Sequence, residues 1–374
     1  MIFTISTSTL LKQLQLISGA LGGSSSSLPI LENFLFQVED GVLTLVATDL
    51  ETFMSSEVDV MADSDGDIAM PAKILMDMLK SLPEQPISFH VDLDTCAISI
   101  MSQTGKYKLV GEPGGDFPEI PELESPEELE ISSSILTTAI EKTLFAVGTD
   151  EFRPAMMGVY FRLDETGVTF VSTDAHKLVK YKRTDITGGK AASFILPKKA
   201  LSLLKNSLPS KDDIPVDVSY DESNVFFEMA GVRLVGRLIE ARFPDYEAVI
   251  PNDNTIEVRV NRGDFQSALK RLAIFSNKTT YQVNFTIGAT EMELLSKDLD
   301  FSNEATEKLD CQRNGEDIEI AFNAKFLLEI LNVLKTEEVV FEMSEPNRAG
   351  LLVPGAKEEH EELLMLIMPI MLGY

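Results

Sequence analysis

Histidines, cysteines and glycine-rich loops are the usual carriers of chemistry, and they are sparse in this sequence of 374 residues. The three histidines, His90, His176 and His360, stand far apart, and none belongs to an HxH or HExxH pattern that would hold a metal. Cys96 and Cys311 are also widely separated, so they indicate neither a disulfide framework nor a metal cluster. We therefore expect no catalytic residues, no metal site and no cofactor.

Motifs for phosphate binding and nucleophilic catalysis are missing as well. The Gly-Gly-Lys at 188–190 is followed by Ala191 rather than Ser or Thr, and it lacks the upstream glycine of a phosphate-binding loop. No GxGxxG or GxSxG pattern occurs. The tripeptide Arg262-Gly263-Asp264 matches an adhesion motif, but it falls at a predicted helix start, where we interpret it as part of a helix cap. The sequence therefore gives no support to an enzyme.

The informative residues are lysines that recur at a fixed spacing. Lys73, Lys199 and Lys325 lie 126 residues apart each time, and each stands near the start of an amphipathic segment. These segments read PAKILMDMLKSLP at 71–83, LPKKALSLLKNSLP at 196–209 and NAKFLLEILNVLK at 323–335. Their apolar residues follow helical spacing, so we expect three equivalent helices that bury side chains such as Leu201, Leu204 and Leu208 against a sheet.

The elements around these helices repeat too. Asp49, Asp174 and Asp298 occupy matching positions in LVATDLETF, FVSTDAHKL and LLSKDLDFS, at spacings of 125 and 124 residues. The proline-containing segments GDFPEIP at 115–121 and ARFPDYEAVIP at 241–251 also match. A period near 125 is far too long for a solenoid repeat, so each unit is predicted to be a whole domain. We place the three domains at 1–124, 125–252 and 253–374.

Within each domain the predicted order is strand, helix, several strands, helix and several strands, which indicates an α+β class of antiparallel sheet with two helices. In the first domain we expect a strand at 2–6, a serine-capped helix at 8–20, a loop at 24–27 and a hairpin that turns at Asp40-Gly41. Further helices are expected at 132–147 and 263–276. The segment 114–130 is rich in proline and acid, so we interpret it as a linker.

The charge is strongly negative overall but unevenly distributed. A net charge of −28 argues at first against a nucleic acid partner, because phosphate binding needs a basic surface. The six predicted helical segments nevertheless carry a net charge of +9. At a Debye length of about 8 Å, a phosphate beside these helices would feel them more than the distant acids. The distribution therefore leaves DNA binding open. We expect no membrane span, because no apolar run is long enough, and no signal peptide, because the N-terminus lacks a basic leader and a small-residue cleavage site.

Several longer stretches resemble the bacterial DNA sliding clamp family, the β subunit of the replicative polymerase. They are LGGSSSSLPILENFLFQV at 21–38, TDAHKL at 173–178, RFPDYEAVIP at 242–251, FSN at 275–277 and LIMPIML at 366–372. The resemblance implies the DNA clamp fold, with three similar domains in each subunit. It also implies that two subunits join head to tail into a six-domain ring that encircles duplex DNA, with helices lining the hole.

A clamp holds DNA by topology, so the resemblance implies weak phosphate contacts that do not depend on sequence. We predict that the DNA-binding residues are Lys73, Lys80, Lys198, Lys199, Lys205, Lys270, Arg271 and Lys325. The family also contacts DNA through an arginine in the loop after the first helix. Here that loop is Ser24–Ser27, so the equivalent contact is absent from our prediction.

The resemblance further implies a hydrophobic pocket that receives a short peptide motif. The expected partners are the replicative polymerase catalytic subunit, the clamp-loader complex, and repair and translesion proteins that carry a clamp-binding motif. The predicted pocket residues are Met156, Thr173, Ala175, His176, Lys177, Leu178, Pro244, Val249, Ile367, Met368, Pro369, Ile370, Met371 and Leu372. The run LLMLIMPIML would otherwise be a final core strand, but its proline makes it a poor central strand, so we favour the pocket.

The sequence departs from the family pattern at Ala248 and Met371, which replace basic residues, so a more apolar pocket is expected. We predict a homodimer interface near Tyr107, Leu109, Ile274 and Phe275. Together these features predict a cytoplasmic, nucleoid-associated processivity factor for DNA replication. The alternative is an acidic three-domain scaffold that binds proteins through the pocket and does not encircle DNA.

Overall fold

A computed structural model describes residues 1–23, 28–124, 126–187 and 190–371. The chain divides into two compact units, described separately here: unit 1 is Met1–Thr137 with Lys199–Leu238, and unit 2 is Thr138–Lys198 with Ile239–Tyr374. The α-helices of the described residues are α1 (Thr7–Ile17), α2 (Ala72–Ser81), α3 (Ser133–Thr143), α4 (Lys198–Ser207), α5 (Arg262–Phe275) and α6 (Ala324–Val333). Each directly follows a strand, so every sequence repeat carries two helices, as predicted.

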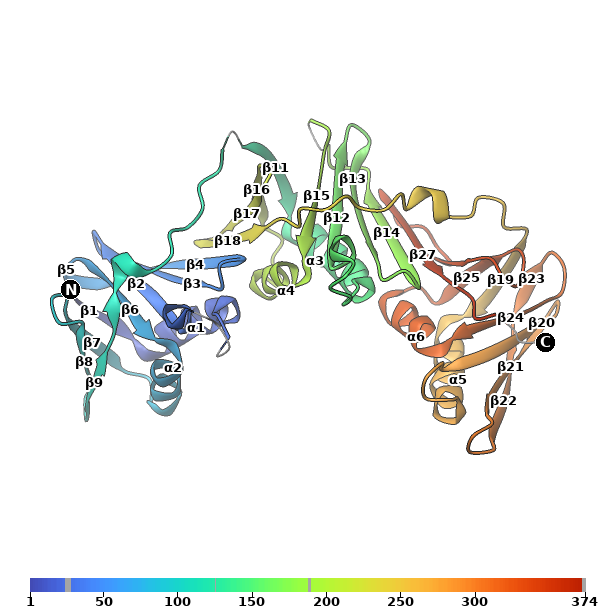
Figure 1. Ribbon diagram of the computed structural model, residues 1–374, viewed down its shortest axis with the longest axis horizontal. Helices are drawn as coiled ribbons and strands as arrows, with labels where there is room; N and C mark the ends of the chain where they lie inside the picture. The colour runs from blue at the N-terminus through green and yellow to red at the C-terminus, as the bar shows by residue number, and fades with distance from the viewer. Residues whose placement is uncertain (24–27, 125, 188–189, 372–374) are drawn as a thin grey trace. The chain divides into compact units, whose positions relative to one another are not determined.

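Unit 1 holds two antiparallel sheets, counted over the residues that the structure describes (Figure 1). The first has the order β5-β1-β7-β8-β9, and the second has the order β10-β6-β2-β3-β4-β18-β17-β16-β11. Their strands are β1 (Ile2–Ser6), β2 (Asn33–Glu39), β3 (Val42–Thr48), β4 (Thr52–Asp59), β5 (Met61–Ser64), β6 (Gly66–Pro71), β7 (Pro86–Asp92), β8 (Ala97–Met101), β9 (Lys106–Val110), β10 (Glu112–Pro113), β11 (Glu127–Ser132), β16 (Pro215–Tyr220), β17 (Asn224–Met229) and β18 (Val232–Arg237).

The core of unit 1 follows from the period of its apolar residues. Phe3 of β1 and Phe89 of β7 stack with ring centroids 4.6 Å apart, and α2 buries its Leu75 and Leu79. Ser6 caps α1 by accepting a hydrogen bond from the backbone N–H of Thr9, so the helix has the expected serine cap, two residues earlier than predicted.

Unit 2 also holds two antiparallel sheets in its described part. Their orders are β15-β12-β13-β14-β27-β26-β25-β19-β23 and β22-β21-β20-β24. The strands are β12 (Gly158–Asp164), β13 (Gly167–Thr173), β14 (Lys177–Arg183), β15 (Ala192–Pro197), β19 (Ile256–Asn261), β20 (Gln282–Ile287), β21 (Glu291–Asp298), β22 (Asn303–Asp310), β23 (Gln312–Asn314), β24 (Ile318–Asn323), β25 (Glu338–Met343), β26 (Gly350–Pro354) and β27 (Glu361–Ile367).

Helices α5 and α6 lie side by side against the sheets of unit 2 (Figure 1). Both are capped by asparagine: Asn261 accepts from the backbone N–H of Asp264, and Asn323 accepts from that of Lys325. The guanidinium of Arg262 donates to backbone carbonyls beyond α6 and within it. The Arg-Gly-Asp tripeptide is therefore the start of a capped helix, as interpreted from the sequence.

Of three sequence predictions about single segments, the structure corrects two and confirms one. The expected linker at 114–130 is wrong in its last part, because β11 begins at Glu127 and pairs with β16. The terminal apolar run is a central strand after all, since β27 lies between β14 and β26, and Pro369 follows the strand rather than interrupting it. The hairpin at Asp40-Gly41 is confirmed by left-handed φ angles of 50° and 82°. The loop 24–27 lies outside the described residues.

Two equivalent strand pairings join consecutive repeats. In the first junction, β4 of the first repeat pairs with β18, the last strand of the second repeat, and Phe53 lies opposite Val235. In the second junction, β14 of the second repeat pairs with β27, the last strand of the third, and Leu178 lies opposite Leu366. In both cases the pairing strand follows the turn that contains the repeated aspartate.

Candidate functional site

The turn at 173–177 is the best organised part of the predicted pocket. The Thr173 hydroxyl donates to the carbonyl of Lys177 at 2.8 Å and accepts from the N–H of Ala175 at 3.1 Å. The Asp174 carboxylate accepts from the backbone N–H groups of His176 and Lys177, both at 2.9 Å. Ala175 has a φ of 74°, a left-handed conformation that strains a residue with a Cβ. The turn is therefore rigid.

Two side chains of this turn face α6. The ammonium of Lys177 is buried and lies 2.6 Å from Asp174 and 3.0 Å from Glu329 of α6. It also stands 4.5 Å from the centre of the Phe326 ring, on which His176 stacks at 5.8 Å. Burial without a partner would be costly for this charge, so the ion pairs fix the turn against α6. The charge of Lys177 is thus directed into the protein rather than toward a bound peptide.

The segment after β27 returns to the same turn. The N–H of Met368 donates to the carbonyl of His176 at 2.9 Å, and the N–H of Ile370 donates to the carbonyl of Ala321 at 2.7 Å. The side chains of Met368 and Met371 are exposed, at 42% and 71%. Because methionine is flexible and polarizable, these side chains can adapt to several apolar ligands. The predicted Leu372 lies outside the described residues.

An apolar cluster connects the remaining pocket segments. Leu178 packs with Leu366, Phe243 and Tyr246, and Ala155 lies against them. Pro244 and Val249 are exposed beside this cluster, and Met156 is half-buried. Ile367 behaves differently, because it is fully buried in the core of the third repeat.

Sequence reasoning therefore missed Ala155, Phe243, Tyr246 and Leu366. Successive side chains of a strand point to opposite faces of the sheet, so an assignment of this run as a strand would have placed Leu366 and Ile367 on opposite faces.

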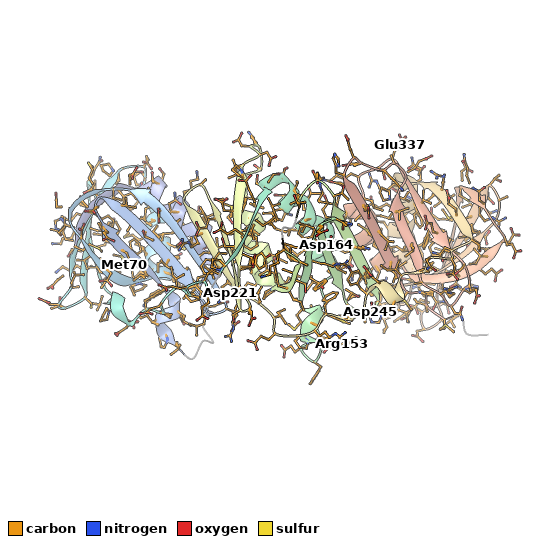
Figure 2. The ribbon with its side chains drawn as sticks, turned by 90° about the horizontal axis from the view of Figure 1, so that it is seen from above. Met70, Arg153, Asp164, Asp221, Asp245 and Glu337 are labelled. Atoms are coloured by element: carbon orange, nitrogen blue, oxygen red, sulfur yellow. The ribbon has the colours of Figure 1, made fainter. Side chains whose placement is uncertain are left out.

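Figure 2 shows Arg153 on a turn before β12, and its guanidinium Nε donates to Asp150 at 2.8 Å, which fixes this turn next to Met156.

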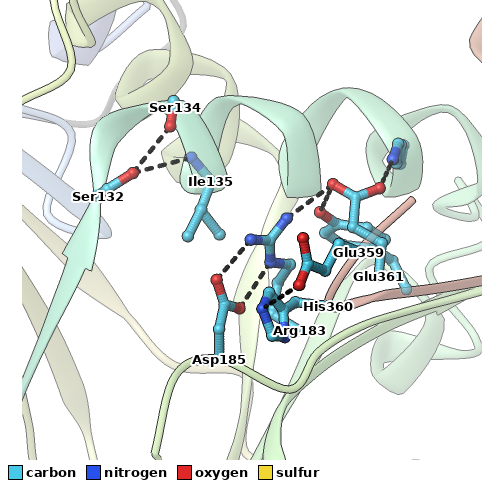
Figure 3. A network of polar contacts seen from close by, with 10 residues as sticks. Ser132, Ser134, Ile135, Arg183, Asp185, Glu359, His360 and Glu361 are labelled. Carbon is cyan, nitrogen blue, oxygen red and sulfur yellow. Dashed lines mark hydrogen bonds and ion pairs between the residues drawn. The ribbon is translucent and has the colours of Figure 1, made fainter.

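A buried charge cluster closes the other end of the β14–β27 pairing (Figure 3). The Glu361 carboxylate accepts from Lys142 of α3 at 2.5 Å, from the Tyr181 hydroxyl at 2.8 Å and from Arg183 at 2.8 Å. Arg183 also forms a bidentate pair with Asp185. Burial would raise the pKa of Glu361, but the hydrogen bonds from Lys142 and Tyr181 outweigh it and hold that pKa below its ordinary value. Burial and the bond to Glu361 raise the pKa of Tyr181.

The eight predicted DNA-binding cations all lie on α2, α4, α5 or α6, and most are exposed. Several of them contact other side chains of the protein. Lys199 lies 2.6 Å from Asp49, Arg271 forms a bidentate pair with Glu307, and Lys325 stands 3.7 Å from the centre of the Tyr281 ring. The hydrogen bonds from Arg271 lower the pKa of Glu307. Free positive charge is therefore smaller than the count of residues suggests.

Polar side chains without charge add to the helical surface of unit 1. A cavity of about 460 Å³ lies where α1 and α4 approach, and its lining includes the amide side chains of Gln13, Gln15 and Asn206 together with Lys12. Amide groups can donate hydrogen bonds to phosphate oxygens. Because they are uncharged, a count of charged residues does not identify them. A Cβ on Gly19 would lie 2.3 Å from the Leu203 side chain, so glycine permits this close approach.

The predicted interface residues lie at sheet edges. Tyr107 and Leu109 are half-buried on β9, an edge strand among the described residues of unit 1. Ile274 and Phe275 end α5 and are exposed at 65% and 40%, beside the edge strand β22 of unit 2. An edge strand offers unpaired backbone groups, which makes it a ready site for pairing with another chain.

No group of three or more His, Cys, Asp and Glu residues within the described ranges is arranged to hold a metal ion. None of the helices in the same ranges combines the length and apolar character required to cross a bilayer.

Comparison with known proteins accounts for this architecture. Three family models match consecutive parts of the chain: the N-terminal domain of the DNA polymerase III beta subunit at residues 1–121, its central domain at 130–245 and its C-terminal domain at 247–370. The chain is similar to the structure of the DNA polymerase III beta subunit from Thermotoga maritima, with a TM-score of 0.90 and 30% identity over all of both chains. It is equally similar to a DnaN sliding clamp from Bartonella birtlesii bound to griselimycin, with a TM-score of 0.92 and 30% identity over all of both chains.

The fold is therefore that of a DNA clamp, with three α+β domains of antiparallel sheet. Among curated relatives, the chain is 31% identical to the beta sliding clamp of Vibrio cholerae over 371 residues, which covers 99% of this chain and all of that protein. It is 30% identical to the beta sliding clamp of Escherichia coli strain K12, over 90% of this chain and 91% of that one. The chain belongs to the beta sliding clamp family of DNA polymerase III beta subunits.

Proposed function

We propose that two copies of this chain close head to tail into a ring that encircles duplex DNA and acts as a processivity factor. One observation carries this proposal: the chain contains two equivalent junctions, β4 with β18 and β14 with β27. By analogy with these two junctions, the third repeat should pair through β22 and the first repeat through β9. Both strands are unpaired edges within the described residues. Pairing β22 of one copy with β9 of the other forms the missing junction twice and closes a ring.

The expected interface includes Tyr107 and Leu109 of one copy and Ile274 and Phe275 of the other. Charge favours this pairing, because β9 carries Lys106 and Lys108. The facing strand β22 carries Glu304, Glu307 and Asp310 against one lysine, Lys308. Opposite charges on paired strands stabilise the pairing and select the correct partner edge.

We expect duplex DNA to pass along the helices, held through sequence-independent phosphate contacts by Lys73, Lys80, Lys198, Lys199, Lys205, Lys270, Arg271 and Lys325. Weak contacts suit a sliding ring, since tight phosphate binding would slow its movement. The protein would act without catalysis or cofactor, in the cytoplasm where the chromosome is replicated. We propose domains at 1–124, 125–252 and 253–374.

The partner proteins would bind where the 173–177 turn, the 242–251 segment and residues 368–371 meet. A short hydrophobic motif of the polymerase catalytic subunit, the clamp loader or a repair protein would place apolar side chains over Leu178 and Leu366. The exposed Met368 and Met371 would cover the ligand. A hydrophobic surface with flexible methionines can accept several related sequences.

Loading on circular DNA tests the ring. The purified chain, its cognate clamp loader and ATP are incubated with nicked circular DNA, and the retained protein is measured by gel filtration. A ring stays on the circle and is released when a restriction enzyme cuts it. An acidic scaffold that uses only the peptide pocket would not be retained, and neither would a chain that sediments as a 41.3 kDa monomer at micromolar concentration.

The pocket is tested separately with an Ile370→Ala variant and a fluorescent clamp-binding peptide. We expect at least a tenfold loss of affinity if Ile370 contacts the peptide. Met61→Ala, which removes an exposed apolar side chain from β5, serves as the control. Unchanged affinity in the Ile370→Ala variant would contradict the proposed pocket and leave the ring proposal intact.

A further inference from the structure

The turn before β22 differs from its two counterparts in length. Asp49, Asp174 and Asp298 each stand four residues after a fully buried side chain, namely Leu45, Phe170 and Leu294.

The strand pairs that close these turns occupy matching positions. Thr48 pairs with Phe53, Thr173 with Leu178 and Lys297 with Glu304. Four residues separate the first two pairs, and six separate the third. The two-residue extension of the third turn brings Leu299 and Phe301 to the surface, with 87% and 75% of each residue exposed.

The two shorter turns both contact the second helix of the next repeat. In the first junction, Asp49 binds Lys199 near the start of α4. In the second, His176 stacks on Phe326 near the start of α6. These helices are related to α2 by the 126-residue spacing, so Ile74 of α2 is the counterpart of Phe326. Ile74 is 53% exposed, which is unusual for an isoleucine on an amphipathic helix.

We propose that Leu299 and Phe301 of one copy pack on Ile74 of a second copy, as an apolar anchor of the junction between subunits. The proposal rests on the ring proposed above. By the registers of the two internal junctions, Glu304 lies opposite Lys108 of the second copy and Ala305 lies opposite Tyr107.

Two independent observations support this register. It places opposite charges across from each other, and it puts the half-buried Ala305 and Tyr107 on the same, core-facing side of the shared sheet. The extended turn then reaches α2 in the same way that the shorter turns reach α4 and α6. Where the internal junctions use an ion pair or an aromatic stack, the junction between subunits uses aliphatic and aromatic side chains.

The contact predicts how the dimer responds to salt. Screening weakens the pairing of Glu304 with Lys108, but it does not weaken apolar burial. The dimer should therefore persist at high ionic strength, and removal of the two apolar side chains should make it both weaker and more sensitive to salt.

Sedimentation velocity over a dilution series measures the dimer dissociation constant of the full chain in 0.1 M and 1 M NaCl. We expect the double variant Leu299→Ser, Phe301→Ser to raise this constant by at least about 100-fold, because two such contacts are lost per ring. Both residues are exposed, so the monomer should keep its thermal stability. Phe152→Ser is the matched control, since Phe152 is 96% exposed and lies on the turn before β12, whose sheet contains neither β9 nor β22.

A cysteine pair tests the contact directly. In a chain with Cys96→Ala and Cys311→Ala, the Ile74→Cys, Leu299→Cys variant should oxidise to covalent dimers. Met61→Cys, Leu299→Cys should not, because Met61 lies on β5 at the opposite edge of the sheet from β9.

The outcomes separate the two proposals. A wild-type dimer that is unaffected by the double serine variant, or a 74–299 disulfide formed within one chain, overturns the apolar anchor and leaves the ring intact. A wild-type chain that stays monomeric at micromolar concentration overturns the ring and the anchor together. A weaker, more salt-sensitive dimer with the expected cross-link supports both.

Discussion

The two internal junctions share one design but differ in where their charges lie. In the first, Asp49 and Lys199 form an ion pair at 2.6 Å, with side chains 20% and 44% exposed. In the second, the side chain of Lys177 is only 6% exposed, and Glu361 at the far end of the ladder is 10% exposed. The second ladder is also longer, running from Lys177 opposite Ile367 to Arg183 opposite Glu361.

This difference explains why the proposed peptide site belongs to the second junction. A buried ion pair is costly to disrupt, so the 173–177 turn and β27 are held in one arrangement. A rigid turn can present exposed apolar side chains to a ligand without a large loss of entropy on binding. The exposed pair in the first junction is screened by water and salt, so it constrains its turn far less.

The largest effect is expected from Glu361→Gln in the second junction. The substitution removes the carboxylate bound to Lys142 and one of the two carboxylates bound to Arg183, which should lower the free energy of unfolding by about 3 kcal/mol. Urea unfolding followed by circular dichroism measures the change. Glu51→Gln, which removes the exposed partner of Arg237 in the first junction, is the control and should cost less than about 0.5 kcal/mol. Equal losses in the two variants would show that burial does not separate the junctions.

Acid should reduce the difference between the wild type and Glu361→Gln. The pKa of Glu361 is held below its ordinary value of 4.5, so its contribution is fully present above pH 4.5 and is lost as the pH falls through the lowered folded value. The gap in the free energy of unfolding should therefore shrink progressively as the pH falls below 4.5. A gap that stays constant from pH 7 to pH 3 would assign the loss to packing rather than charge.

How far the sequence could lead is clearest from the residues of these junctions. The recurring lysines and aspartates predict three similar domains, because both residue types return at nearly constant spacing on matching elements. The pairing of β4 with β18 could not be predicted, since nothing in either strand identifies a partner some 180 residues away. The cluster around Glu361 was missed for the same reason: its members lie on α3, β14 and β27.

Backbone strain is a feature that the two junctions should share. Leu50 and Ala175 occupy the same position of their turns, with φ angles of 78° and 74°. Glycine avoids the steric cost of this conformation, about 1 kcal/mol or more, but loses more entropy on folding. Ala175→Gly and Leu50→Gly should therefore each raise the free energy of unfolding by up to about 0.5 kcal/mol. A gain in one turn together with a loss in the other would mean that local packing, not the shared turn geometry, decides the sign.

The smallest expected effect is the coupling between Asp49 and Lys199, and it provides the sharpest contrast between the junctions. A double-mutant cycle of Asp49→Asn with Lys199→Gln should give a coupling below about 0.5 kcal/mol, because both groups reach solvent. The same cycle with Glu361→Gln and Lys142→Gln should give more than about 1.5 kcal/mol, because both of those side chains are nearly buried. Thermal and urea unfolding of the six variants supply both cycles. A first-junction coupling as large as the second would mean that the exposed pair also fixes its turn, and rigidity would then no longer distinguish the proposed peptide site.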